Sequence, residues 1–218
     1  CAQDLTTGFN CVPSDQLSTC EPACGPQLVC EGGLCHANGS QEREWTFLVY
    51  MVGDNNLSAF AYTDIDEMET VGSTDQVSIV VQAEFSSEYR ELLDNAGDIS
   101  PALLDNSFRF EVGYHSERGV IDEDLVVNGA IGNQDMGHPT SLTEFIQWGT
   151  STYPANNYAL ALWDHGGGWI GGFRDETSES ELRLADIRGA IEDAGVYLDL
   201  LDFDACLMGQ YEVALELN

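Results

Sequence analysis

The sequence predicts an α/β fold, with a mostly parallel sheet between helices, preceded by a small disulfide-rich segment. Between residues 41 and 218, strand-length runs of apolar residues alternate with amphipathic segments of helical length, which is typical of parallel strands covered on both faces. Six of the seven cysteines lie within the first 35 residues. We therefore divide the chain into a cysteine-rich segment or linker, residues 1–40, and a main domain, residues 41–218.

The predicted elements follow in order. The run WTFLVYMV at 45–52 is the first buried strand, ended by Gly53, and Ser58 caps a helix that reaches about residue 71. Residues 77–83 form the second strand, and the alternating residues 108–113 a shorter one. A helix with Ser and Thr caps is expected over 140–148, then a strand at 158–163 and a glycine-rich loop. A helix at 184–194, a strand at 198–203 and a helical segment at 207–217 complete the domain.

The cysteine-rich segment holds Cys1, Cys11, Cys20, Cys24, Cys30 and Cys35. A segment so short cannot bury a core, so we expect disulfides and an oxidising compartment. Three disulfides are the simple count. Cys1 is also a candidate lipid anchor of a bacterial lipoprotein, because the chain starts at cysteine as after removal of a signal peptide. That anchor leaves one of the other five thiols unpaired, and both alternatives stay open.

Composition excludes several classes of function. With Lys+Arg 7 and Asp+Glu 38, the net charge is −31, so the chain cannot build a basic stripe for nucleic acid. No apolar run has the length of a membrane span. We expect a monomer that is secreted, periplasmic or held on a bacterial surface, with the excess carboxylates keeping it solvated.

Two residues that directly follow predicted strands suggest chemistry. His165 stands in WDHGGGW after the strand at 158–163, and Cys206 stands in DFDACLMG after the strand at 198–203. The carboxyl ends of parallel strands meet at one edge, so a thiol and an imidazole could share a crevice there, as nucleophilic catalysis requires. The glycines at 166–168 could expose backbone amides to an oxyanion.

Two carboxylates flank these residues. Asp204 shares a face with Cys206, where it would blunt the thiol's reactivity unless it receives a cation from the substrate, which points to an Arg or Lys side chain. Asp164 adjoins His165 but points to the opposite face, so we expect it to solvate the strand end or form a turn.

These motifs resemble the clostripain family of cysteine peptidases, relatives of the caspases, gingipains and legumains. The matching segments are WTFLVYMVGDNNL at 45–57, MGHPTSLTEFIQW at 136–148, YALALWDHGGGW at 158–169 and LDLLDFDACLMG at 198–209. The resemblance implies hydrolysis of peptide bonds after Arg or Lys by a Cys-His dyad that needs no third residue. It implies Cys206 as nucleophile and His165 as general acid/base. The amides of Gly166 and Cys206 would be the oxyanion donors, and Asp204 would line the pocket for the substrate's basic side chain.

The resemblance also implies maturation by a cut after a basic residue between the two motifs. Arg174 and Arg183 are the candidates, and we predict Arg174. The chemistry requires no cofactor or metal, although some family members depend on calcium. A Ca²⁺ site could be sought at the acidic group on the predicted first helix, formed by Asp64, Asp66, Glu67 and Glu69, whose helical spacing favours a solvated face instead.

The family fold continues beyond the nucleophile motif, so the chain is expected to be truncated after it. Two other functions therefore stay open. One is a catalytically inactive or fragmentary cell-surface protein that binds basic peptides through its acidic crevice. The other is a structural or adhesive protein in which the cysteine-rich segment dominates.

Overall fold

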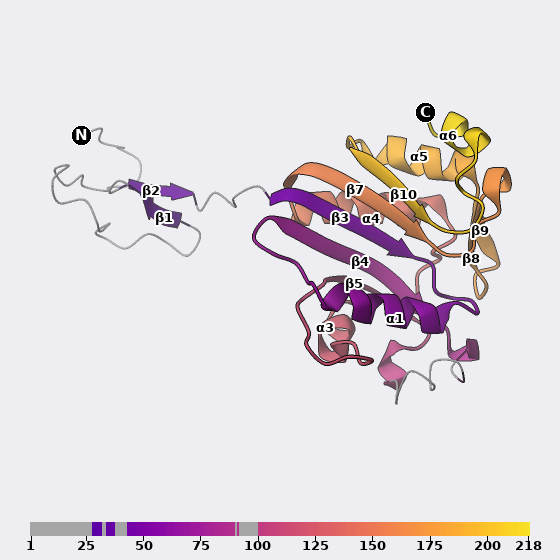
Figure 1. Ribbon diagram of the computed structural model, residues 1–218, viewed down its shortest axis with the longest axis horizontal. Helices are drawn as coiled ribbons and strands as arrows, with labels where there is room; N and C mark the ends of the chain where they lie inside the picture. The colour runs from indigo at the N-terminus through magenta and orange to yellow at the C-terminus, as the bar shows by residue number, and fades with distance from the viewer. Residues whose placement is uncertain (1–27, 32–33, 38–42, 90, 92–99) are drawn as a thin grey trace. The chain divides into compact units, whose positions relative to one another are not determined.

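The computed structural model describes residues 28–31, 34–37, 43–89, 91 and 100–218 (Figure 1). The chain divides into two compact units, Cys1–Glu42 and Arg43–Asn218. In the first unit, β1 (Leu28–Glu31) pairs antiparallel with β2 (Leu34–Ala37), with Cys30 opposite Cys35 in the backbone register. The predicted disulfides and the predicted anchor at Cys1 lie outside the residues whose side chains are described.

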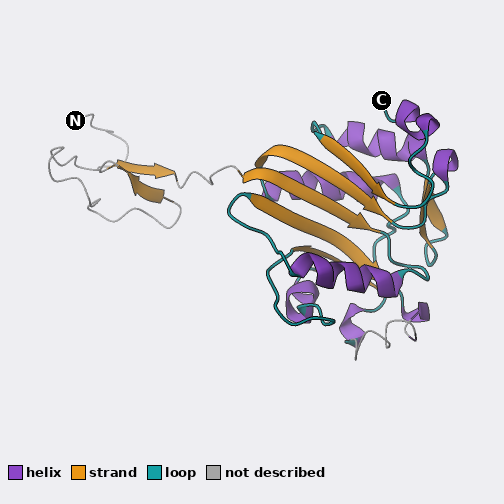
Figure 2. Ribbon diagram, in the orientation of Figure 1, coloured by secondary structure: helices purple, strands orange, loops and turns teal. Residues whose placement is uncertain are grey.

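The second unit is built on a six-stranded sheet in the order β10-β7-β3-β4-β5-β6 (Figures 1 and 2). Four neighbouring strands run parallel, β5 runs antiparallel to β4, and β6 runs antiparallel to β5. The strands are β3 (Arg43–Met51), β4 (Val77–Phe85), β5 (Asn106–Glu111), β6 (Ala130–Gly132), β7 (Ala155–Trp163) and β10 (Leu200–Asp204). The predicted mostly parallel α/β sheet is thus confirmed, with an antiparallel edge.

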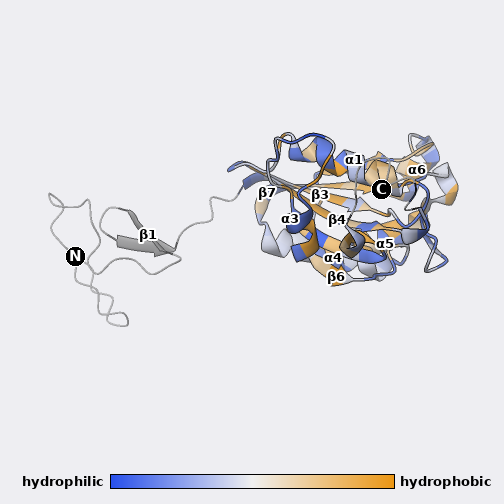
Figure 3. Ribbon diagram, turned by 90° about the horizontal axis from the view of Figure 1, so that it is seen from below, coloured by the Kyte–Doolittle hydropathy of each residue, from blue (hydrophilic) through white to orange (hydrophobic). Residues whose placement is uncertain are grey.

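Helices cover both faces of this sheet, with α1 (Ser58–Glu69) on one side of the strands and α4 (Pro139–Thr152) and α5 (Leu184–Ala194) on the other (Figure 3). One face packs against α4, α5 and α6 (Tyr211–Glu216). The opposite face packs against α1 and α3 (Glu123–Asn128). The nearly continuous apolar sequence of the central strands is explained by these two cores, because alternate side chains enter opposite ones.

The short elements were not predicted from the sequence. They are β6, α3 and the hairpin of β8 (Gly172–Asp175) with β9 (Ser180–Leu182), together with the turns η1 (Ser87–Tyr89), η2 (Pro101–Leu103) and η3 (Gly168–Ile170). Most are too short and too polar to show a hydrophobic period. The hairpin matters for the site, because it inserts between the histidine loop and α5.

Two predicted helix caps are wrong. The first helix is capped by Leu57, and the Ser58 hydroxyl instead donates to the carbonyl of Gly53 at 2.6 Å. The helix predicted at 140–148 is capped by His138, whose Nδ1 accepts from the amide of Thr140, and it begins at Pro139. Proline suits the first helical position, where an amide proton would have no partner. Within the described residues, no helix has the length and apolar character needed to cross a membrane.

Candidate active site

Three adjacent parallel strands, β3, β7 and β10, end at the same edge of the sheet, and the loop after each one contributes to a single site. His165 follows β7 by two residues and Cys206 follows β10 by two residues. The two strands pair in register, with Trp163 opposite Asp204. Both residues line one cavity of about 460 Å³, together with Leu57, Trp163, Asp164, Phe203, Asp204 and Ala205.

The loop after β3 supplies a partner for the histidine. Asn56 Oδ1 lies 2.8 Å from His165 Nε2. An amide oxygen accepts a hydrogen bond, so this contact places the imidazole proton on Nε2 and leaves Nδ1 as the basic nitrogen. Sequence analysis missed Asn56, although it stands in the quoted segment GDNNL. Its role depends on β3 lying beside β7, which the sequence alone did not show.

The histidine and cysteine loops touch through their backbones at Gly166. A Cβ placed on Gly166 would lie 2.0 Å from the carbonyl oxygen of Cys206. Any residue other than glycine would therefore clash with that oxygen. Two hydrogen bonds around Gly166 hold its loop, from Phe173 N to His165 O and from Gly167 N to Gly171 O. Within the described residues, the amides of Gly166 and Cys206 both lack a hydrogen-bond acceptor.

Local backbone geometry presents the thiol outward. Cys206 is exposed and carries a free thiol. The next residue, Leu207, has φ of 64° and leaves 66% of its surface exposed, an unfavourable conformation for a side chain of this kind. Met208 then enters the core. The turn between the edge strand and the core therefore leaves Cys206 exposed beyond the end of β10.

Asp204 lines the cavity, and Asp64 of α1 lies near it without lining the cavity; we call these two carboxylates the acidic corner. Asp204 is exposed, whereas Asp64 accepts a hydrogen bond from the indole of Trp163 at 2.7 Å. Burial raises the pKa of Asp64, the indole bond lowers it, and the negative charge of Asp204 raises it further. Asp64 and Asp204 thus lie close enough to repel each other.

Asp164 lies in a bend after β7, but it does not solvate the strand end, so that alternative of the expectation is wrong. It is 3% exposed and accepts from Asn55 Nδ2 at 2.7 Å and from the amide of Arg174 at 2.6 Å. Burial raises its pKa to about 7, against the lowering effect of these hydrogen bonds. Because β7 ends at Trp163, strand alternation does not govern the next residue, and Asp164 ties together the loop after β3, its own loop and β8.

The acidic group on α1, formed by Asp64, Asp66, Glu67 and Glu69, does not converge on one point. Asp66 accepts from the amide of Gly119, and Glu69 accepts from the amide of Asp122. Both carboxylates are buried, so the predicted solvated face is also wrong. Glu67 is exposed to solvent, unlike Asp66 and Glu69.

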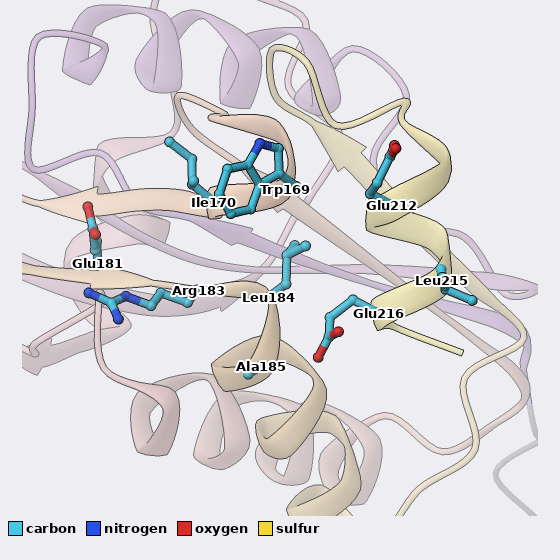
Figure 4. A pocket seen from close by; sticks show the side chains of 9 residues that line it. All are labelled: Trp169, Ile170, Glu181, Arg183, Leu184, Ala185, Glu212, Leu215 and Glu216. Atoms are coloured by element: carbon cyan, nitrogen blue, oxygen red, sulfur yellow. The ribbon is translucent and has the colours of Figure 1, made fainter.

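The two candidate cleavage residues lie in different surroundings. Arg174 is in β8, and its carbonyl accepts from Asn55 Nδ2 at 3.1 Å. Arg183 precedes α5 and lines a second groove of about 720 Å³ between η3, α5 and α6 (Figure 4). The apolar part of this groove comes from Trp169, Ile170, Leu184 and Leu215. It shares no lining residue with the cavity of His165 and Cys206.

Comparison with known proteins agrees with this arrangement. The profile described as Clostripain family matches residues 49–218. Clostripain from Hathewaya histolytica is 27% identical to this chain over 201 residues, which cover 83% of this chain and 37% of that protein.

Solved structures show the same fold. A secreted C11 cysteine protease from Bacteroides thetaiotaomicron, in complex with an irreversible peptide inhibitor, matches with a TM-score of 0.60 at 24% identity, covering 80% of this chain and 46% of that chain. An inactive zymogen C11 protease from Parabacteroides distasonis matches with a TM-score of 0.57 at 23% identity, covering 81% and 46%. This chain therefore spans less than half the length of each relative described.

Proposed function

The chain belongs to the clostripain family, and from this premise we propose that Cys206 and His165 hydrolyse peptide bonds after Arg or Lys. Family membership confirms the resemblance inferred from the sequence motifs. The observation that carries the proposal is the meeting of the free thiol, the imidazole and the carboxylate of Asp204 in one cavity. The activity, the substrates and the partners remain proposals for this chain.

The proposed reaction uses groups of the protein alone. His165 Nδ1 takes the proton of Cys206, and the thiolate sulfur attacks the scissile carbonyl carbon. The amides of Gly166 and Cys206, which have no acceptor among the described residues, bind the resulting oxyanion. His165 then gives its proton to the amine as the C–N bond breaks. Water, deprotonated by His165, cleaves the thioester and restores the thiol.

Recognition of the basic side chain is assigned to the acidic corner. A guanidinium or ammonium group near Asp204 and Asp64 would relieve the repulsion between the two carboxylates. Chemistry of this kind needs no cofactor. A calcium ion, which some family members require, is proposed only as a structural ligand, because protein groups make every proton and acyl transfer.

Maturation by a cut after Arg174 is also proposed. The amide of Arg174 donates to Asp164, and its carbonyl accepts from Asn55. A cut after Arg174 would therefore break the chain within the hydrogen bonds that join β8 to the loops beside His165. Mass mapping of an aged preparation should find a new N-terminus at Asp175. A cut only after Arg183, or an intact chain in active protein, would contradict this.

We also propose the partners and the location of the protein. Protein or peptide substrates with accessible Arg or Lys follow from the acidic cavity, and a secreted or surface-held monomer fits the cysteine-rich first segment. A lipid anchor at Cys1 is kept as a proposal. Intact-mass measurement of protein extracted from its own cell envelope would show the added acyl mass if the anchor exists.

The test of the activity is labelling by an Arg-terminated peptide chloromethyl ketone, whose chloride leaves as the thiolate sulfur bonds to the methylene carbon. We expect an adduct at Cys206, found by mass spectrometry, that forms at least tenfold more slowly in His165→Ala and with a matched Gln-terminated peptide. A Cys206→Ser control reports labelling elsewhere. If Cys206 reacts with iodoacetamide but not with the Arg peptide, the peptidase proposal is wrong. Binding of Arg peptides without labelling would then support the inactive basic-peptide-binding function.

A further inference from the structure

Three buried carboxylates form a cluster that adjoins the loops of the candidate active site but does not line its cavity. Asp54 comes from the loop after β3, Glu84 from the end of β4 and Asp175 from the end of β8. Their exposed fractions are 6%, 3% and 1%. Neither the peptidase chemistry nor the predicted calcium site on α1 uses any of them.

The three side chains converge on a point. Each offers one carboxylate oxygen, and the three oxygens lie within 4.8 Å of one another. Ca²⁺ binds oxygen at 2.3–2.6 Å, so two ligands on opposite sides of the ion are up to about 5 Å apart. One ion of this size could therefore contact all three residues without a large movement.

Among the described residues, the cluster has no positively charged partner. In the part of the chain that the structure describes, none of the ion pairs includes Asp54, Glu84 or Asp175, and the whole sequence contains no lysine. Backbone amides satisfy part of the charge, with Thr177 N donating to Asp54 and Met136 N and Ser178 N donating to Asp175. Several buried carboxylates held together are unfavourable unless protons or a cation neutralise them.

One oxygen of the cluster, on Glu84, stands out because no donor in the described part of the chain reaches it. Glu84 Oε2 accepts from the hydroxyl of Ser107, but Glu84 Oε1 is buried and has no hydrogen-bond partner among the described residues. A buried acceptor without a donor is rare in folded proteins, and an unseen ion is one of its ordinary explanations. This second observation distinguishes the cluster from the other acidic groups, whose buried oxygens accept from backbone amides.

We propose that Asp54, Glu84 and Asp175 bind one hard divalent cation, Ca²⁺ in the first place. The ion would join the loop after β3 to the ends of β4 and β8. Asp54 directly precedes Asn55 and Asn56, which hold Asp164 and His165, so binding would stiffen the support of the imidazole. Cation binding itself does not depend on the proposed peptidase activity.

The test is calcium binding to the full chain, which has been freed of metal with EDTA and returned to chelator-free buffer. Isothermal titration with CaCl₂ should show one site above the weak background of a highly acidic surface, and Tb³⁺ should give sensitised emission that Ca²⁺ displaces. Saturating Ca²⁺ should raise the midpoint of thermal unfolding by about 5 °C, because a ligand that binds only the folded state stabilises it.

Glu84→Gln is the informative variant. It removes the orphaned charge while keeping the shape of the side chain, so we expect it to unfold at the same or a higher temperature than wild type without Ca²⁺. Its calcium affinity should fall at least tenfold, and its calcium-induced shift should be lost. Glu67→Gln, which changes one exposed carboxylate of the α1 group, should bind Ca²⁺ as wild type does.

Two results would overturn the proposal. One is an unchanged unfolding midpoint with no single-site heat in wild type, which would mean that protons neutralise the cluster. The other is an equal loss of binding in Glu67→Gln and Glu84→Gln, which would indicate diffuse attraction to the acidic surface. Labelling of Cys206 is measured separately, so a failed cation site and a failed peptidase proposal remain distinguishable.

Discussion

Asn55 and Asn56 are adjacent, yet each serves a different part of the site. Asn55 donates to Asp164 and to the carbonyl of Arg174, whereas Asn56 accepts from His165. The first contact fixes the loop after β3, and the second uses that fixed loop to orient the imidazole. In the proposed reaction Asn56 is therefore a positioning residue, because it would act through His165.

Asn56→Ala tests this role. Without the acceptor, His165 can turn and its proton is no longer confined to Nε2, so we expect alkylation of Cys206 by the Arg peptide ketone to slow by about tenfold or more. The pH profile of the alkylation rate should shift as well. Asn56→Asp keeps an acceptor oxygen and should recover part of the rate. Equal rates in wild type and Asn56→Ala would exclude the positioning role.

Asp164 makes stability depend on pH. Its folded pKa of about 7 lies above the ordinary value for an aspartate, so the folded state binds the proton more tightly than the unfolded state. The contribution to stability is therefore complete below about pH 4 and is lost as the pH rises towards 7. Over this window the loss is at most on the order of 4 kcal/mol.

Asp164→Asn isolates that contribution, because the amide stays neutral throughout. We expect the free energy of unfolding of the variant, relative to wild type, to rise between pH 4 and pH 8. Urea unfolding at several pH values measures it, and the other buried carboxyls cancel in the difference. Parallel pH profiles for the two proteins would mean that Asp164 does not titrate as described.

Among the elements, the long apolar ones were predictable and the short polar ones were not. The strands β3, β4 and β7 are predicted by nearly continuous runs of apolar residues, and the helix α5 by its amphipathic pattern. By contrast, β6 depends on pairing with β5, which is distant in the sequence. The β8–β9 hairpin is a local pairing, but its strands are too short and too polar to show a hydrophobic period.

The same division holds for the site. His165 and Cys206 could be found because each follows a recognisable strand, and adjacent parallel strands bring their ends together. Asn56, Asp164 and the cluster of Asp54, Glu84 and Asp175 depend on contacts between loops from three or four strands. No spacing within one segment encodes such contacts.

Substitution of Gly166 tests how closely the histidine and cysteine loops pack, and substitution of Gly189 is the control. A methyl group at Gly166 would collide with the carbonyl of Cys206, whereas Gly189, inside α5, has no atom within 4 Å of its added Cβ. Gly166→Ala should therefore slow labelling of Cys206 by about a hundredfold. Gly189→Ala should leave labelling unchanged and stabilise the fold by about 0.5–1 kcal/mol, because alanine favours the helix.

Labelling rates and urea unfolding of both variants give the comparison. If Gly166→Ala labels at the wild-type rate, the close approach of the two loops is not needed for the thiol's reactivity. If Gly189→Ala destabilises the protein, the open space beside α5 is not as described.

For the whole molecule, the dominant property is its charge. The sequence carries a net charge of −31, and only a few ion pairs occur in the described residues, such as Arg43 with Glu111 and Arg188 with Glu216. Most carboxylates are therefore opposed by solvent and by one another. Compaction brings these charges closer than they are in the unfolded chain, so self-repulsion destabilises the folded state.

Screening should consequently stabilise the protein. Raising NaCl from 10 to 150 mM shortens the Debye length from about 30 Å to about 8 Å, which removes repulsion between distant carboxylates and leaves short contacts largely intact. We expect the midpoint of thermal unfolding to rise by about 5 °C, measured in EDTA so that divalent ions contribute nothing. Sucrose of equal osmolality is the control for a general solute effect. A midpoint that stays constant or falls with NaCl would mean that local carboxylate contacts, rather than the overall charge, set the stability of this chain.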